Sequence, residues 1–266
     1  MLNIVKSVNY GLRKDTGVII SLVAMLGFPF FIIALISNMD AEGLKSVTVS
    51  FLVGSQLLGM VYGFSYLGII IISCKAMGMD GSDKTINYEI MSGHRRFKVF
   101  AGRVISGIVW GVILVLIIDS LPVLVFCLAN GWGKETEPFD VIIRMLLCFF
   151  PMLRLCAFHM MIASLLGSAG KGIAAGLGVF TALDIIESIM ADNFNMQTDN
   201  MFGFINILSL LIPQNSREFI VDGKPVTIFD TSIDSHMVLL TIGVSLLLTV
   251  LYLTVAFIVF KKKDRH

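Results

Sequence analysis

The sequence predicts an all-α membrane protein with six transmembrane helices. Of its 266 residues, 56% are hydrophobic and only 15% are charged. Its mean hydropathy is +0.87, which is typical of integral membrane proteins rather than of soluble domains. The apolar residues form long continuous runs, and about 20 apolar residues in a helix cross the hydrocarbon core of a bilayer. Because the runs do not alternate in polarity, a transmembrane β-barrel is not expected.

Six apolar runs are expected to cross the membrane, so that residues 1–266 form a single transmembrane domain. The predicted spans are approximately residues 17–37, 46–74, 104–129, 141–167, 172–190 and 238–260. The first run is too long for the apolar part of a cleavable signal peptide. Four cysteines lie in or at the ends of these runs without C-x-x-C spacing. We interpret them as small buried hydrophobic residues rather than as disulfides or metal ligands.

The orientation of the chain follows from its Lys and Arg residues, which resist translocation and stay on the cytoplasmic side. Fourteen of them fall in the N-terminal segment, the loop after the second run, the turn after the fourth run and the C-terminal tail. Only four fall in the opposite loops. Both termini of this multi-pass protein are therefore expected in the cytoplasm, and a bacterial plasma membrane is the expected location.

Residues 1–15 have the pattern of an amphipathic helix, with apolar residues largely on one side and basic residues interspersed. The apolar residues are Leu2, Ile4, Val5, Val8 and Leu12. Such a helix is expected to lie along the inner leaflet. A loosely ordered basic leader is the alternative.

The longest loop, residues 191–237, contains an apolar block over residues 201–213 that ends at Pro213. Thirteen residues are too few to cross the membrane as a helix. We expect a re-entrant or interfacial helical hairpin that covers the outer mouth of the bundle. The alternative is a small extracellular core packed on its own loop.

The loop after the second run, SDKTINYEIMSGHRRFKVFAGRVI over residues 82–105, predicts a helix of about two turns. Asp83 or Thr85 can cap its start, and Gly93 suits a left-handed C-terminal stop. Ile90 and Met91 fall on its apolar side with Ile86. A short helix with an apolar face on the cytoplasmic side needs a partner surface. Anchoring of its basic residues to anionic lipid head groups is the alternative.

The N-terminal helix, the loop TINYEIMSGHRRFKVFAGRVI and the apolar hairpin together resemble the type-2 permeases of ATP-binding-cassette (ABC) transporters. In that family the loop contains a coupling helix that docks in a groove of the ATPase. The resemblance implies that residues 88–91 form this helix and that residues 92–96 form the step after it, with His94 near the place of the family's usual proline. The implied ATPase contacts are Tyr88, Glu89, Ile90, Met91, His94, Arg95 and Arg96.

The chain contains no G-x-x-x-x-G-K-[ST] motif that could bind nucleotide phosphates. The resemblance implies that ATP and Mg²⁺ bind to separate ATPase subunits, and that a second permease chain, identical or homologous, completes the transporter. Motifs of zinc proteases and of serine hydrolases are also missing from the sequence, and its four histidines are scattered. We therefore expect no catalytic residue, no metal site and no nucleic-acid partner on this chain.

Six ionisable side chains fall inside the predicted spans. They are Asp119, Arg144, Arg154, His159, Asp184 and Glu187. Such residues are costly in lipid and usually have partners. Their depths are compatible with pairs between Arg144 and either Asp184 or Glu187, and between Arg154 and Asp119. We favour structural ion pairs over a role on the translocation path.

Small residues four apart allow close approach of helices in lipid. Gly172 and Gly176 make such a step at the start of the fifth run. Helix packing within the bundle is the expected role. A dimer seam is the alternative, because family analogy places that seam along the first and fifth spans.

The leading hypothesis is therefore the permease subunit of an ATP-driven exporter of amphipathic or hydrophobic substrates, such as antimicrobial peptides, drugs or lipids. One alternative is an ion-coupled secondary transporter that uses the intramembrane acids and His159 as carriers, although no convincing inverted repeat is found. Another is a non-transporting membrane protein that confers immunity to a toxin.

Overall fold

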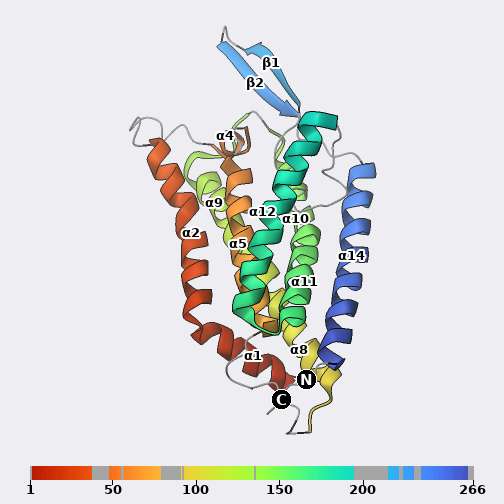
Figure 1. Ribbon diagram of the computed structural model, residues 1–266. Helices are drawn as coiled ribbons and strands as arrows, with labels where there is room; N and C mark the ends of the chain where they lie inside the picture. Colours follow the sequence, from red (N-terminus) through yellow and green to blue (C-terminus); the bar gives the residue numbers. More distant parts are fainter. Residues whose placement is uncertain are drawn as a thin grey trace.

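The computed structural model describes residues 2–37, 48–54, 57–78, 91, 93–134, 136–194, 215–221, 224–230 and 235–262. Long helices run alongside one another to form a bundle (Figure 1). Its long single helices are α2 (Thr16–Ser37), α5 (Leu57–Gly78), α12 (Ala169–Phe194) and α14 (Ser235–Lys262). The short helix α1 (Leu2–Lys14) and the last turn of α14 lie at one end, which we call the α1 end.

The helix α1 confirms the amphipathic pattern of the N-terminal segment. Ile4, Val8 and Leu12 are buried on one side of it, while Leu2 and Tyr10 are exposed. The buried side packs on α8 (Arg96–Ile108), where a Cβ atom on Gly102 would lie only 2.8 Å from Cγ2 of Ile4. A 69° bend separates α1 from α2. Much of the apolar side expected to face lipid is therefore used against the chain itself.

The third predicted span is longer than expected. The helix α8, the π-helical turn η1 (Val109–Ile113) and α9 (Leu114–Asn130) form one apolar segment of 35 residues, Arg96–Asn130. In η1 the amide of Leu114 bonds to the carbonyl of Val109, five residues back instead of four. Gly131, with a φ of 79°, ends the segment.

The fourth predicted span consists of two helices, α10 (Pro138–Leu147) and α11 (Phe149–Leu166). Proline at the first position suits a helix start, and Gly167, in the left-handed conformation, ends α11. A further short helix, α4 (Val49–Gly54), lies at the opposite end of the bundle from α1 (Figure 1).

Three described segments are long and apolar enough to cross a membrane. They are Arg96–Asn130, Pro138–Leu166 and Val238–Lys262. A fourth is added if the bent pair Leu2–Lys14 and Thr16–Phe31 counts as one span. The protein is thus a multi-pass helical membrane protein. Helices α5 and α12 occupy the predicted second and fifth spans, and the total of six remains a prediction.

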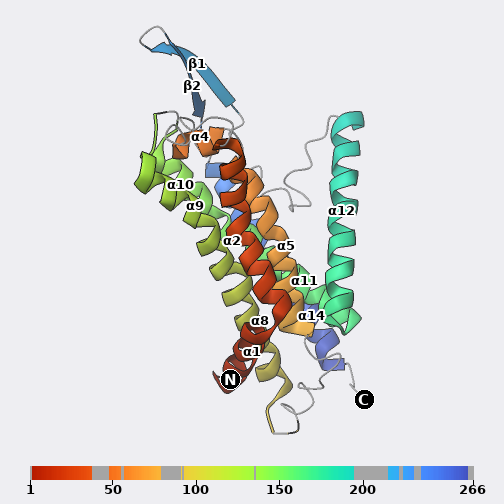
Figure 2. The same cartoon turned by 90° about the vertical axis from the view of Figure 1, so that its left-hand side faces the viewer.

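An antiparallel β-hairpin interrupts the expected all-α fold. Strands β1 (Asn215–Val221) and β2 (Lys224–Asp230) pair from Asn215 opposite Asp230 to Val221 opposite Lys224. The hairpin lies at the end opposite α1 (Figures 1 and 2). The pattern did not predict it, although Asp222 and Gly223 are a turn signal in the sequence. The helical hairpin predicted over residues 201–213 lies outside the described residues.

The core lies where α5 and α11 meet η1. Fully buried side chains there include Ile69, Ile72, Met152 and Leu155, and Gly111 of η1 approaches Ser73 and Cys156. Cys74, Cys148 and Cys156 are buried free thiols, as predicted. The fourth cysteine, Cys127, is exposed on the side of α9, so its predicted burial is wrong.

Candidate functional site

The predicted ATPase-contact loop joins α5 to α8, and the start of α8 lies at the α1 end (Figure 1). Tyr88, Glu89 and Ile90 lie outside the described residues, and so does the predicted helix over residues 83–91 apart from Met91, which is 81% exposed. Gly93 has the expected positive φ, 86°. His94, Arg95 and Arg96 follow it, and of these three Arg95 is exposed and the others are half-buried.

The C-terminal end of the loop, where α8 begins, is attached to the end of α14. Nη1 of Arg96 donates a hydrogen bond to the carbonyl oxygen of Lys261 at 2.5 Å. The last carbonyls of a helix have no partner within it, and a basic side chain suits them. Phe97 and Phe100 place their rings 5.7 and 5.2 Å from the ring of Phe257. The start of α8 and the last turns of α14 are therefore joined by one polar and several aromatic contacts.

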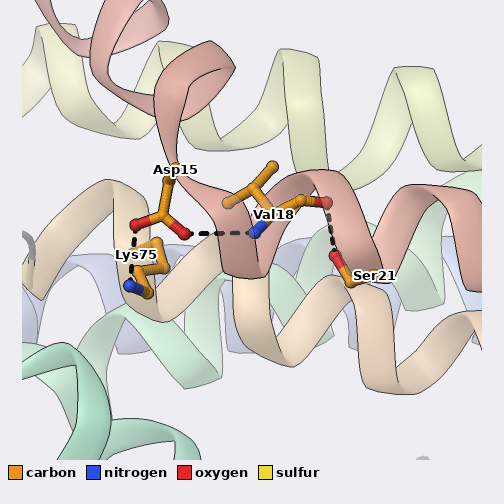
Figure 3. Close-up of polar contacts among 4 residues, drawn as sticks. All are labelled: Asp15, Val18, Ser21 and Lys75. Atoms are coloured by element: carbon orange, nitrogen blue, oxygen red, sulfur yellow. Dashed lines mark hydrogen bonds and ion pairs between the residues drawn. The ribbon is translucent and has the colours of Figure 1, made fainter.

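The N-terminal end of the loop, where α5 ends, is attached to the bend between α1 and α2. Nζ of Lys75 lies 2.7 Å from Oδ2 of Asp15 (Figure 3). The other oxygen of Asp15 accepts a hydrogen bond from the amide of Val18 at 3.1 Å and thereby caps α2. The hydroxyl of Ser21 donates to the carbonyl of Val18 at 2.8 Å. Asp15 thus holds the bend and binds α5 to it.

The contacts of Asp15 change the pKa of its carboxyl group. Burial by itself would raise the pKa of the carboxyl group, but the hydrogen bond from Lys75, the bond from the amide of Val18 and the charge of Lys75 outweigh it. The pKa of Asp15 therefore lies below its ordinary value. The pattern missed this cluster, although Asp15 directly before the first apolar run is an N-cap signal.

The end of α5 also touches the start of α12. A Cβ atom on Gly78 would lie 2.6 Å from the backbone nitrogen of Ala169, so the two backbones are in direct contact. Both ends of the loop are thereby packed against helices that continue through the bundle. This arrangement has no catalytic chemistry. It can transmit a displacement of the loop to α2, α12 and α14.

The intramembrane ion pair predicted between Arg154 and Asp119 does not form. Oδ1 of Asp119 on α9 accepts a hydrogen bond from the hydroxyl of Ser65 on α5, and its Oδ2 is buried without a hydrogen-bond partner among the described residues. Both terminal nitrogens of Arg154 on α11 are likewise buried without a hydrogen-bond partner in the described chain. Equal depth did not bring the two side chains together, because they face different neighbouring helices.

The other predicted pair stays a prediction. Arg144 is buried near the end of α10. Asp184 and Glu187 lie on α12, but their side chains are outside the described part of the structure.

His159 has the features of a structural core residue. Its Nδ1 lies 2.8 Å from the carbonyl of Leu155 and donates to it, which leaves Nε2 as the acceptor. The ring meets Tyr66 of α5 edge to face, with centroids 5.8 Å apart. No group of three metal-ligating side chains occurs within the described residues.

Gly172 and Gly176 pack inside the bundle. Cβ atoms on them would lie 3.0 Å from Cα of Ala163 and 2.9 Å from Nε2 of His159, both on α11. The structure thus places both glycines in helix packing, and their buried side is occupied by α11 of the same chain. Gly178, farther along α12, has nothing within 4 Å of such an atom.

The fold defines a class of protein: a multi-pass helical membrane protein. The family model described as ABC-2 family transporter protein matches residues 19–265. The chain belongs to this family, which confirms the resemblance found in the loop. It is a transmembrane permease subunit without an ATPase domain, and permeases of this family pair with ABC ATPase subunits. No curated protein matches the sequence significantly.

The family match covers residues 19–265, and it decides between the three functions considered from the sequence. It supports the ABC permease over the ion-coupled secondary transporter and the toxin-immunity protein. It indicates no substrate.

Proposed function

We propose that this permease is the membrane subunit of an ATP-driven exporter, and that its motor engages the loop of residues 79–95 between α5 and α8. ATP and Mg²⁺ are bound by the separate ATPase chains. One observation carries the proposal: both ends of this loop are attached to other helices, through Lys75 to Asp15 and through Arg96 to Lys261. A loop attached in this way can pass the motion of a docked partner to the bundle.

The proposed topology has six spans with both termini in the cytoplasm. The α1 end carries α1, the start of α8 and the last turn of α14, while the β-hairpin lies at the opposite end (Figure 1). That arrangement supports an even number of crossings. The basic residues of the α1 end support its cytoplasmic location.

The proposed substrates are amphipathic or hydrophobic molecules, such as antimicrobial peptides, drugs or lipids. A second permease chain, identical or homologous, would complete the pathway. The wide apolar surface of the helices supports this substrate class, because apolar cargo needs few polar groups along its path. Membrane lipid is the remaining partner.

The test is co-purification of the permease with an ABC ATPase expressed from the same source. Replacement of Ile90 and Met91 by Asp places charge on the proposed docking surface. We expect the ATPase to be lost from the purified complex, because a charged group cannot enter an apolar groove without a partner. Phe139→Asp is the matched control, since Phe139 is an exposed aromatic residue near the opposite end.

The control variant should retain the ATPase. Normal ATPase association and turnover in the Ile90→Asp, Met91→Asp variant would contradict the assignment of the loop. Loss in both variants would show a general effect of added charge and would count equally against it.

A further inference from the structure

Arg154 lies near the middle of the apolar segment Pro138–Leu166. Its side chain is 2% exposed, and neither Nη1 nor Nη2 has a hydrogen-bond partner among the described residues. A guanidinium group carries five N–H donors and stays charged, so leaving it buried and unpaired is costly. Helices α11 and α14 contain no Asp or Glu in the sequence. Neither α11 nor α14, the helix that packs most extensively on it, therefore supplies a counter-charge.

The part of α14 that lies next to Arg154 carries polar side chains. Helices α11 and α14 lie side by side and run in the same direction (Figure 1). The rings of Phe158 and Tyr252 meet with centroids 5.2 Å apart, which fixes the relative height of the two helices. The phenol group of Tyr252 lies within electrostatic range of the Arg154 guanidinium.

The turns of α14 before Tyr252 carry further hydroxyl groups. Arg154 lies about one helical turn before Phe158, which corresponds to the level of Thr249 on α14, and Ser245 lies about one turn farther from Tyr252. Both are buried, and with Tyr252 they share one face of the helix. The hydroxyl of Ser245 has no hydrogen-bond partner among the described residues, whereas that of Thr249 bonds to the carbonyl of Ser245. The terminal nitrogens of Arg154 and the hydroxyl of Ser245, all without a hydrogen-bond partner among the described residues, therefore lie within about one helical turn of each other along the bundle.

We propose that Arg154, Ser245 and Tyr252 form a site for the phosphate or carboxylate head group of an amphiphile. The proposal rests on the proposed export function, since the amphiphile would be cargo. Two guanidinium N–H groups match two oxygens of such an anion, and the hydroxyl groups of Ser245 and Tyr252 add donors. Leu246, exposed on α14 next to Ser245, is available to an alkyl chain.

The depth of the site favours cargo over resting bilayer lipid. The hydrocarbon core is about 30 Å thick, so lipid phosphates lie about 15 Å from its middle. Arg154 is near the middle of its segment. An anion reaches this depth when its molecule is being moved through the protein.

The test uses the purified full-length protein in the neutral detergent dodecyl maltoside, with dodecyl phosphate and dodecanoate as anionic probes. We expect both to bind and to raise the melting temperature. Arg154→Met should weaken the apparent Kd by about tenfold or more, since a charge-assisted hydrogen bond is lost, and Arg154→Lys should weaken it less. Thr254→Ala is the matched control, because Thr254 is exposed on α14. It should bind as the wild type does.

Several outcomes would overturn the site. Equal binding of the anionic probes by Arg154→Met and wild type would show that the probes bind elsewhere. Equal binding of the cation dodecyltrimethylammonium would show that the site does not distinguish an anionic from a cationic head group. Equal affinity for inorganic phosphate alone would assign the site to a free anion. Stabilisation only in nanodiscs that contain phosphatidylglycerol, and none by dodecyl phosphate, would assign it to bilayer lipid.

A second measurement separates this role from a structural one. Without probe, Arg154→Met should melt at the same temperature as the wild type or higher, because it removes an unpaired buried charge. A clear drop, or failure to fold, would show that Arg154 is paired within the protein and would overturn the proposal. The variant Ser245→Ala with Tyr252→Phe keeps the packing and should also weaken probe binding; unchanged binding would contradict their role.

These measurements need no ATPase. Loss of probe binding would therefore leave the proposed docking of the motor intact. Conversely, failure of the docking test would leave an amphiphile-binding membrane protein.

Discussion

At the residue scale, single side chains of this permease hold the helices in place. Asp15 accepts hydrogen bonds from both a backbone amide and Lys75, and so fixes the bend between α1 and α2. Gly176 allows α12 to touch the ring of His159. Arg154 is the exception, because its terminal nitrogens have no hydrogen-bond partner among the described residues. The first two support the fold, whereas the third is the residue proposed to bind a ligand.

Asp15→Asn tests the bend between α1 and α2 through its pH dependence. The pKa of Asp15 is lowered in the folded protein, so its pair with Lys75 stabilises the fold fully above the unfolded pKa, about 4. The contribution is lost as the pH falls through the lower, folded value. We expect the variant to lose about 1 kcal/mol or less at pH 7, because the pair is partly exposed.

The measurement is thermal unfolding in detergent from pH 7 down to pH 3. The decline of the melting temperature at acidic pH should be shallower in Asp15→Asn than in the wild type. Lys75→Met removes the same pair from the other side and serves as the matched variant. An identical acidic decline in all three proteins would contradict the role of the pair.

Gly176→Ala tests the contact between α12 and α11. The added Cβ atom would lie 2.6 Å from Cδ2 of His159, a fully buried ring that cannot move aside easily. We expect a loss of about 1–3 kcal/mol in unfolding free energy. Gly178→Ala on the same helix meets open space and should be neutral. Equal stability of the two variants, measured by denaturant unfolding, would count against the contact.

At the element scale, the helices themselves were largely predictable, whereas their faces and ends were not. Continuous apolar runs predicted α2, α5, α12 and α14, since length and composition decide whether a helix crosses lipid. The start of α8 was missed because Arg96, Lys98 and Arg103 lower its average hydropathy. Its apolar face, with Val99 and Phe100, nevertheless packs within the protein.

The pairing of Arg154 with Asp119 failed for a related reason. A sequence gives the depth of a residue along its helix, but not the direction around the helix axis once helices are packed. Asp119 faces Ser65 on α5, and Arg154 lies near Tyr252 on α14. The docking role of the loop was predicted from its family pattern, whereas the bonds next to its two ends join residues 60 and 165 positions apart. Such distant partners follow only from the fold.

Arg96→Gln tests the attachment of α8 to α14. The shorter side chain cannot reach the carbonyl of Lys261, so the last turn of α14 should fray. We expect amide hydrogen exchange over residues 258–262 to rise by about fivefold, the effect of roughly 1 kcal/mol. Arg95→Gln is the control, because Arg95 is an exposed neighbour. Unchanged protection in Arg96→Gln would show that the aromatic contacts alone hold the two helices.

At the scale of the whole molecule, the permease has two different ends. One carries α1, the start of α8 and the end of α14, and the other carries α4 and the β-hairpin (Figures 1 and 2). This division fits a subunit that meets its motor on one side only. The long helices connect the two ends, so a displacement at the α1 end can be transmitted to the opposite end.

The proposed orientation is tested with single cysteines in a protein whose exposed Cys127 is replaced by Ser. A membrane-impermeant maleimide should label Lys224→Cys on the hairpin in intact cells. Tyr10→Cys, exposed on α1, should react only after the cells are permeabilised. The reverse pattern would place the docking loop outside the cell, where no ATPase could reach it.

The π-helical turn η1 has a consequence for the neighbours that the third span can contact. Its extra residue rotates everything after it by about 100° relative to a regular α-helix. The half before η1 is therefore free to match α1 and α14, and the half after it to aim Asp119 at Ser65. Deleting one residue from the turn would rotate the Asp119 carboxylate toward a different neighbouring helix while leaving the basic half in place. The two halves of this one helical segment can therefore face their neighbours independently.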